Sequence, residues 1–252
     1  MADYFITGVS SGIGRALAGE LVRRGHRVWG IARRRELLGA LQSELGGQRF
    51  FFSVCDVARA EEVTATVQAL DRASFRPDVV VLNAGVNPEG SGVPLSQEVF
   101  EQVIQVNLFG AIAWIHVFLP RFRIERRGHF VAISSLAAFR GDARWVAYAA
   151  SKAALSRAFE SLRGRHESEG LTFTTVHLGA VGAGMGAQSR SPVRLSDEKA
   201  ARRIADFPGS TVSVIRAIRT ARAMPCSSSF RISASRSRIR ASRCAWQSTI
   251  ID

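Results

Sequence analysis

Thr7-Gly8-Val9-Ser10-Ser11-Gly12-Ile13-Gly14 decides the fold, because this stretch follows the apolar run Tyr4-Phe5-Ile6 directly and leads into the helix-forming residues Arg15-Ala16-Leu17-Ala18. A glycine at position 8 permits a sharp turn from strand to helix, and glycines at positions 12 and 14 let the backbone approach a diphosphate while the helix packs closely on the sheet. The helix N-terminus then offers free N–H groups and a positive dipole end to that anion. An ordinary glycine-rich turn shares this composition, but the position at the first strand–helix junction favours a dinucleotide-binding loop.

The pattern continues along the chain, where short apolar runs alternate with longer segments of helical periodicity. This alternation is typical of βαβ units, and we predict an α/β fold: a single doubly wound Rossmann domain over residues 1–200, with a parallel sheet flanked by helices on both faces. The predicted strands are 3–7, 27–32, 49–54, 78–82, 128–134 and 171–177. The predicted helices are 12–24, 34–45, 59–73, 97–124 and 146–168.

Residues 201–252 differ from the rest of the chain in composition. Ten arginines and two aspartates give them a formal charge of +8, out of +13 for all 252 residues. Serine and arginine dominate 227–236, so we predict a basic, atypical and poorly ordered tail. It could bind nucleic acid or an acidic membrane, be a disordered end, or result from a reading-frame shift that replaced the natural C-terminus. Because composition alone is weak evidence for a partner, we expect no nucleic acid and no membrane.

Cysteine usage and the N-terminus bear on the compartment. Cys55, Cys226 and Cys244 have no paired or metal-ligand spacing, so we predict neither a disulfide framework nor a metal site. The chain runs from Met1 into a strand without the features of a signal peptide. The apolar stretch 109–119 contains a histidine and falls short of the ~18 residues that a membrane-spanning helix needs. We therefore expect a soluble, cytoplasmic protein.

Three arginines follow the second predicted strand, where a dinucleotide-binding fold often carries an acid that binds the ribose 2′-hydroxyl. An acid would repel a 2′-phosphate, whereas the guanidinium of Arg33 or Arg34 can bind it through charge-assisted hydrogen bonds. A solvated charge run is the alternative, although a helix N-terminus disfavours cations. NADP(H) is therefore favoured over NAD(H) as the cofactor.

Tyr148 and Lys152 stand four residues apart, hence on one face of a predicted helix. A nearby cation stabilises a phenolate and lowers the tyrosine pKa, so that the side chain can exchange a proton with a carbonyl or alcohol oxygen. Such a spacing alone usually means a surface pair. Here Ser134-Ser135 ends a predicted strand thirteen residues upstream of Tyr148, on the rim where α/β sheets bind ligands, although a serine pair can also simply cap a turn. Asn83-Ala84-Gly85 closes the fourth strand at the same rim, and Asn107 lies inside an apolar helix, where an amide usually needs a polar partner.

Together these motifs resemble the short-chain dehydrogenase/reductase family, over roughly residues 3–180. Thr7 to Gly14 matches its T-G-x-x-x-G-x-G loop, Asn83-Ala84-Gly85 its N-A-G motif, and Tyr148/Lys152 its Y-x-x-x-K pair. The resemblance implies an oxidoreductase that interconverts a small-molecule carbonyl and a secondary alcohol, as a possible homodimer or homotetramer. Tyr148 would be the acid/base, Lys152 would lower its pKa and bind the nicotinamide ribose, Ser135 would orient the substrate oxygen, and Asn107 would join a proton relay through water. The implied cofactor contacts are Thr7, Gly8, Ser10, Ser11, Gly12, Ile13, Gly14, Arg33, Arg34, Asp56, Val57, Asn83, Ala84, Gly85, Tyr148, Lys152, Gly179 and Val181.

The chain departs from the family pattern after the sixth predicted strand. Leu178 replaces the usual proline, and Ala183 replaces a threonine that helps to hold the nicotinamide carboxamide. Family members also continue with a further helix and strand, and we predict no strand after Pro208, which would leave the edge of the sixth strand exposed. These departures support an alternative function, that of a nucleotide-binding or regulatory protein with weak or no turnover. Side chains expected near the substrate give an apolar wall: Val86, Phe139, Trp145 and Met185.

Overall fold

Eight strands form one parallel sheet in the computed structural model, which describes residues 1–182, 195–206, 213–215 and 249–251. The strand order is β3-β2-β1-β4-β5-β6-β7-β8, so the chain moves outward from β1 in one direction and then, from β4, in the other. This reversal creates a crevice at the carboxyl ends of β1 and β4, where doubly wound folds bind ligands. The strands are β1 (Asp3–Thr7), β2 (Arg27–Ala32), β3 (Phe50–Val54), β4 (Val79–Leu82), β5 (Gly128–Ser135), β6 (Leu171–Leu178), β7 (Ser213–Ile215) and β8 (Thr249–Ile251).

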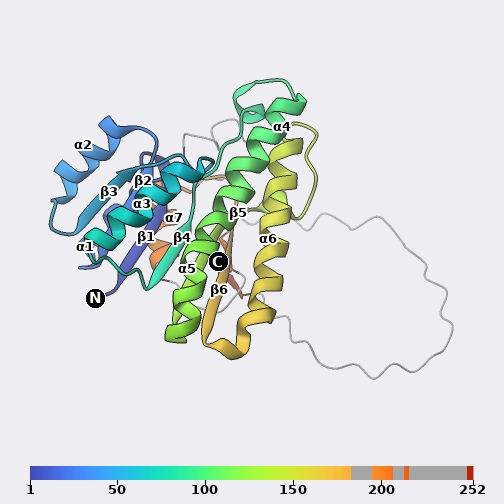
Figure 1. Cartoon of the computed structure of the whole chain (residues 1–252). Helices are drawn as coiled ribbons and strands as arrows, with labels where there is room; N and C mark the ends of the chain where they lie inside the picture. Colours follow the sequence, from blue (N-terminus) through green and yellow to red (C-terminus); the bar gives the residue numbers. More distant parts are fainter. Residues whose placement is uncertain (183–194, 207–212, 216–248, 252) are drawn as a thin grey trace, which may run out of the picture.

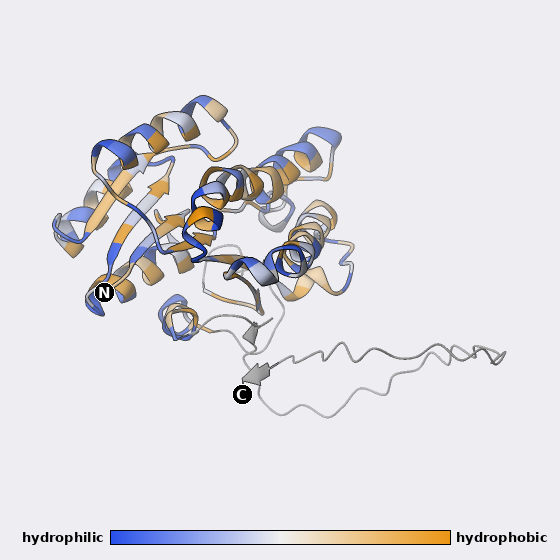
Figure 2. Cartoon of the chain, turned by 60° about the horizontal axis from the view of Figure 1, so that its bottom comes forward, coloured by the Kyte–Doolittle hydropathy of each residue, from blue (hydrophilic) through white to orange (hydrophobic). Residues whose placement is uncertain are grey.

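Helices cover both faces of the sheet (Figure 1). One face carries α3 (Ala60–Arg72), α5 (Gly110–Glu125) and α6 (Val146–His166), with α4 (Gln97–Ile104) beside α6. The other face carries α1 (Gly12–Arg23), α2 (Arg35–Leu45) and α7 (Asp197–Ala205). The central strands are largely apolar, while the outer helices alternate between hydrophobic and hydrophilic residues (Figure 2). The structure thus confirms the predicted doubly wound α/β class.

Strand register aligns a row of large apolar side chains under α3, α5 and α6. Phe5 pairs with Trp29 on one side and with Val80 on the other, and Val80 in turn pairs with Phe130. Phe130 continues the row to Phe173, whose ring lies 5.2 Å from its own. Because successive residues of a strand face opposite sides, the same register turns the neighbouring residues toward α1, α2 and α7. One strand register therefore produces the apolar clusters on both faces of the sheet.

The C-terminal strands correct one sequence prediction. All six predicted strands are present, but the prediction that no strand follows Pro208 is wrong. The backbone of β7 pairs in parallel with Val176–Leu178 of β6, and β8 pairs with β7. The edge of β6 is therefore covered along these residues. Strands of three residues are too short to show an alternating pattern, which is why the sequence did not reveal them.

The predicted single helix 97–124 has an interruption. Gln105–Phe109 forms a π-helical turn, η2, between α4 and α5. Among the described residues, one helical stretch, Gln97–Glu125, is long and apolar enough to span a bilayer by length and composition alone. The stretch meets this test because the helix extends beyond the apolar run 109–119, which is too short by itself. In the fold the stretch packs on the sheet, because Trp114 and Phe122 are buried in the aromatic core.

Helix α7 lies outside the predicted helices and crosses the predicted domain boundary at residue 200. Ala200, Ala201 and Ile204 are buried against the core that α1 shares, and the Asp206 carboxylate lies 2.7 Å from Arg24 Nη1. The division into 1–200 and 201–252 stays a prediction. The Ser/Arg-rich segment 227–236 lies outside the described residues.

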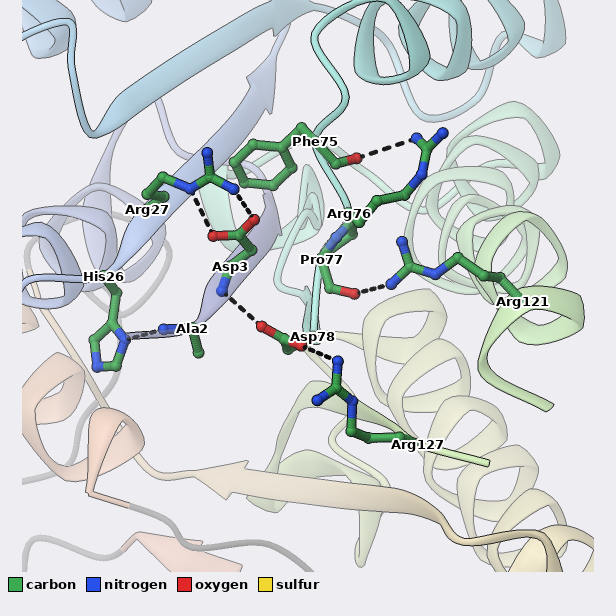
Figure 3. Close-up of polar contacts among 10 residues, drawn as sticks. All are labelled: Ala2, Asp3, His26, Arg27, Phe75, Arg76, Pro77, Asp78, Arg121 and Arg127. Atoms are coloured by element: carbon green, nitrogen blue, oxygen red, sulfur yellow. Dashed lines mark hydrogen bonds and ion pairs between the residues drawn. The ribbon is translucent and has the colours of Figure 1, made fainter. Parts of the chain in front are cut away.

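Ion pairs join the amino ends of neighbouring strands (Figure 3). The Arg27 guanidinium pairs with the Asp3 carboxylate, and the Asp3 N–H donates to Asp78 Oδ2 at 3.0 Å. Arg127 Nη2 lies 3.1 Å from Asp78 Oδ1. These contacts link the amino ends of β1, β2, β4 and β5, and we assign them a structural role.

Candidate active site

The glycine loop has the geometry of a phosphate-binding turn. Gly8 and Gly12 have φ of +77° and +59°, values that other residues rarely adopt. Apart from Gly12 itself, its chain neighbours and the backbone of its own helix, no heavy atom of the described residues lies within 4 Å of the place where a Cβ on Gly12 would stand, so the backbone is open to a ligand there. Ser11 is the N-cap of α1 and makes no side-chain cap hydrogen bond. The first N–H groups of α1 therefore lack that internal acceptor and fit a diphosphate.

Asn83 fastens this loop to the end of β4. Its Nδ2 donates to the carbonyl oxygens of Thr7 and Gly8, at 2.9 and 3.1 Å. In return, the N–H groups of Asn83 and Ala84 donate to Thr7 Oγ1 at 3.0 and 2.9 Å. The structure thus brings together the two motifs that the sequence singled out, and shows that Asn83 shapes the loop.

Gly14→Ala is expected to lower the melting temperature and to abolish nucleotide binding. A Cβ at position 14 would overlap Gly8 O and would stand 2.5 Å from Asn83 Nδ2, so the loop or α1 must shift. Such overpacking costs about 1–3 kcal/mol. Thermal unfolding and NADPH fluorescence titration measure the two effects. Gly39→Ala, on α2 with open space around its Cβ, is the matched control, and unchanged NADPH binding by Gly14→Ala would contradict the assignment.

Of the two predicted arginines, Arg34 is the one at the glycine loop. Its Nη2 donates to Ser10 Oγ and Ser11 Oγ, both at 2.8 Å. Arg33 turns instead toward the end of β3, where its Nη1 lies 3.9 Å from Asp56 Oδ2. A phosphate at the carboxyl end of β2 would therefore lie near the Arg34 guanidinium and near the two serine hydroxyl groups to which it donates.

Ser135, Tyr148 and Lys152 come together at the carboxyl end of β5. Ser135 ends that strand, and α6 presents Tyr148 and Lys152 one turn apart beside it. The Ser135 side chain lies near enough to Tyr148 to lower the pKa of the phenol by hydrogen bonding. The Lys152 ammonium lies 5.7 Å from the centre of the Tyr148 ring and donates to the Ile133 carbonyl oxygen at 2.8 Å. A Cβ on Gly85 would stand 3.5 Å from Lys152 Nζ, so the Asn83-Ala84-Gly85 segment borders the same group.

Burial controls the ionisation of this cluster. It lowers the pKa of Lys152 from 10.5 to about 8, because only 3% of the residue is exposed and the charged form is poorly solvated. Burial also raises the pKa of Tyr148 above its ordinary value, and the hydrogen bond with Ser135 offsets this in part. The net direction for Tyr148 is opposite to the lowering that the sequence predicted from Lys152. The protein alone thus holds a neutral phenol beside an ammonium group.

Asn107 occupies the π-helical turn and is 1% exposed. Its Oδ1 accepts from the Val86 N–H at 2.7 Å, and its Nδ2 donates to Val86 O and to Ser151 Oγ, each at 3.0 Å. Ser151 Oγ in turn donates to the Tyr148 carbonyl oxygen at 2.7 Å. These bonds give the Asn107 side chain a positioning role. A role in a water relay stays a prediction.

The remaining predicted cofactor contacts lie around this crevice in different settings. Asp56 Oδ1 accepts from the Ala58 N–H at 3.0 Å, and the Val57 side chain is buried against Gly110. Gly179 follows β6, and Val181 is 9% exposed and bridges to Leu195. The predicted positions Ala183 and Met185 lie outside the described residues.

A buried polar chain behind Lys152 was not predicted. Ser134 Oγ and Ser156 Oγ are 2.8 Å apart, and both donate to the Lys152 carbonyl oxygen, at 3.3 and 2.7 Å. Ser156 Oγ also lies 3.2 Å from Nε2 of His177, and burial lowers the pKa of His177 to about 4. Since serine is common on helix surfaces, nothing in the sequence marked position 156. The neutral imidazole and the two hydroxyls hold α6 against β5 and β6.

Comparisons with known proteins agree with this geometry. The family model described as short chain dehydrogenase matches residues 4–194. An uncharacterized oxidoreductase of Myxococcus xanthus is 39% identical over 190 residues, 75% of each chain, and the NADPH-dependent pterin aldehyde reductase of Arabidopsis thaliana is 38% identical over 152 residues, 60% of this chain and 63% of that one. The NADPH-bound structure of a short chain oxidoreductase from Pseudomonas aeruginosa PAO1 has a TM-score of 0.70 at 27% identity, over 81% of this chain and 88% of that one. The chain belongs to the short-chain dehydrogenase/reductase family and is an oxidoreductase of that family.

Proposed function

We propose that this protein is an NADP(H)-dependent oxidoreductase that interconverts a carbonyl and a secondary alcohol, with Tyr148 as the acid/base. The observation that carries the proposal is the meeting of Ser135, Tyr148 and Lys152 at the rim of the sheet that also holds the glycine loop. A bound nicotinamide nucleotide supplies or accepts the hydride. The protein has to place the substrate oxygen and move one proton.

In the reductive direction, Ser135 donates a hydrogen bond to the substrate carbonyl oxygen and Tyr148 gives that oxygen its proton. The raised pKa keeps Tyr148 protonated at neutral pH, which is the form that an acid must have. The Lys152 ammonium, with a pKa of about 8, is charged at pH 7 and stabilises the phenolate that forms. This distribution of protons is the starting state that the reductive direction needs, and the oxidative direction needs the Tyr148 phenolate instead.

The preference for NADP(H) is supported by Arg34. An arginine that donates to Ser10 and Ser11 lies where the second strand meets the loop, and a 2′-phosphate there would receive charge-assisted hydrogen bonds. The pterin aldehyde reductase relative, whose name states NADPH dependence, points the same way. Asp56 faces Arg33, which reduces the part that Arg33 can play.

Nucleotide titration tests the cofactor assignment. Arg34→Ala is expected to raise the Kd for NADPH about 10- to 150-fold, since a charged hydrogen-bond partner is worth about 1.5–3 kcal/mol, and to change the Kd for NADH by less than about twofold. Nucleotide fluorescence measures both constants. Arg35→Ala removes the same charge one residue further on, at the start of α2, and is the control. Equal losses of NADPH and NADH affinity in Arg34→Ala would refute the 2′-phosphate contact.

Turnover tests the enzyme assignment. Reduction of members of a carbonyl panel by NADPH is the expected result. Tight nucleotide binding without any turnover would favour the alternative of a nucleotide-binding protein, for which the replacement of proline by Leu178 is the supporting observation. Leu178 is buried at the end of β6, where it extends the strand.

Substrate, assembly and location complete the proposal. Phe139, with 62% of its surface exposed, and Val86 lie on the segments after β5 and β4 and fit an apolar substrate wall. A hollow of about 500 Å³ between 137–143 and α6 adjoins this wall. We also propose a homodimer or homotetramer that uses α5 and α6, and a cytoplasmic location without nucleic-acid or membrane partners.

A further inference from the structure

Helix α6 begins without a capping side chain of its own. Trp145 stands before its first residue and has no side-chain acceptor, and the first turn contains no acid. Asp142, the nearest preceding carboxylate, is bound to Arg144 through the backbone N–H at 3.0 Å and through the guanidinium, with 2.6 Å between Arg144 Nη2 and Asp142 Oδ2. The first N–H groups of the catalytic helix therefore need an acceptor from elsewhere.

Glu89 supplies that acceptor from the segment after β4. Its Oε1 accepts from the Val146 N–H at 3.0 Å, and its Oε2 accepts from the Ala147 N–H at 2.9 Å. Both oxygens of one carboxylate thus bind the two residues that directly precede Tyr148. A carboxylate at a helix N-terminus is also stabilised by the helix dipole, and hydrogen bonds to a charged acceptor are stronger than those to a neutral one.

The segment that carries Glu89 is held in place by other contacts. Asn107 binds both backbone groups of Val86, as described above, and Asn87 Oδ1 accepts from the Gly90 N–H at 3.1 Å. Asn87 is 7% exposed, and a Cβ on Gly90 would stand 2.5 Å from its Nδ2, so this turn is closely packed. Glu89 therefore reaches α6 from a fixed support.

We propose that Glu89 is a positioning residue: by capping α6 it sets the position of the Tyr148 hydroxyl relative to Ser135. The inference rests on the proposed function. Ser135 is fixed on β5, whereas Tyr148 is the third residue of α6 and lies in the first turn, the part of a helix that frays most readily without a cap. Together, Glu89 and Asn107 join the segment after β4 to the first and second turns of α6, because Glu89 binds Val146 and Ala147 and Asn107 binds Ser151.

Three variants test the proposal: Glu89→Ala, Glu89→Gln and Glu89→Asp. Loss of the cap is expected to lower kcat for carbonyl reduction about 10-fold in Glu89→Ala, because small displacements of a reacting group are costly. KM and the Kd for NADPH should change by less than about twofold, since the glycine loop is untouched. Glu89→Gln keeps the reach but offers one acceptor oxygen and turns its N–H₂ donor toward the other backbone N–H, so it is expected to recover kcat only in part. Glu89→Asp keeps the charge but is too short to bind both N–H groups, and its kcat is expected to stay below that of the wild type.

Hydrogen exchange of the amides of residues 146–148 is the second readout, and it does not depend on turnover. In Glu89→Ala, the hydrogen-exchange rates of these amides should be about 10-fold higher than in the wild type. Glu101→Ala removes an exposed carboxylate on α4, and Ser196→Ala removes the cap of α7, so the two controls reproduce the loss of charge and the loss of a cap without touching α6.

The outcomes separate the two proposals. Unchanged kcat in a folded Glu89→Ala protein, or a fall in kcat that Ser196→Ala matches, would overturn the positioning role. If Glu89→Ala does not fold, a Glu89→Asp protein with wild-type kcat and wild-type exchange would overturn it too. If the wild type reduces no carbonyl at all, the proposed function fails, and unaltered exchange at 146–148 would then show that Glu89 does not cap α6.

Discussion

Tyr148→Phe is expected to lower kcat for carbonyl reduction by about 10²- to 10⁴-fold, which is the usual contribution of a positioned acid or base. The substitution removes only the phenolic oxygen, so the ring keeps its place beside Lys152. The Kd for NADPH should stay within about twofold of the wild-type value, since the glycine loop and Arg34 are unchanged. Steady-state kinetics and fluorescence titration measure the two effects separately.

The chain offers a matched control for this experiment. Tyr4, its only other tyrosine, lies on β1 with its ring 5.1 Å from that of His26, at the amino edge of the sheet. Tyr4→Phe makes the same chemical change on the opposite side of the fold from the glycine loop and should leave kcat unaltered. Full turnover by Tyr148→Phe would mean that another group moves the proton, and the acid/base assignment would be withdrawn.

The parts of the fold that sequence could predict are those with a periodic pattern. The six predicted strands and the helices between them were found because short apolar runs alternate with segments of helical periodicity along the chain. Strands β7 and β8 have three residues each, which is too short for a recognisable pattern, so the sequence did not predict them. The π-helical turn at Asn107 was also missed, because it changes the hydrogen bonds of a helix and leaves its composition apolar.

The candidate site divides in the same way. Gly8, Gly14, Tyr148 and Lys152 stand in short motifs whose spacing has a physical reason, so the sequence marked them. Glu89 is 57 residues before the first residue of the helix that it caps. No motif in the sequence around Glu89 or around Val146 indicates that the two residues are in contact. The choice between Arg33 and Arg34 likewise needed the structure. The two adjacent residues are both arginines, and they differ only in the direction in which their side chains extend.

Lys152→Met is expected to lower kcat at least about 100-fold and, at pH 7, to raise the melting temperature. Without the ammonium, the phenolate that forms on Tyr148 has no counter-charge, and such electrostatic stabilisation is worth about 10²- to 10³-fold in kcat. The folded chain, in contrast, bears a cost for burying a charged amine, because the pKa of Lys152 falls from 10.5 to about 8 on folding. Removal of that charge should therefore stabilise the protein, by a few degrees in Tm at ~2–4 °C per kcal/mol.

The pH dependence identifies the cause. Between pH 8 and 10.5 the unfolded chain binds more protons at Lys152 than the folded chain does, so the stability of the wild type rises with pH across this interval. The gain in Tm from Lys152→Met should thus be largest below pH 8 and should shrink as the pH rises toward 10.5. Lys199, the only other lysine, is exposed on α7, and Lys199→Met should show neither effect. A loss of turnover with no gain in Tm at pH 7 would mean that the bond to the Ile133 carbonyl outweighs the cost of burial. A gain in Tm with turnover retained would remove Lys152 from the catalytic group, because the protein would then carry a buried charge that its reaction does not use.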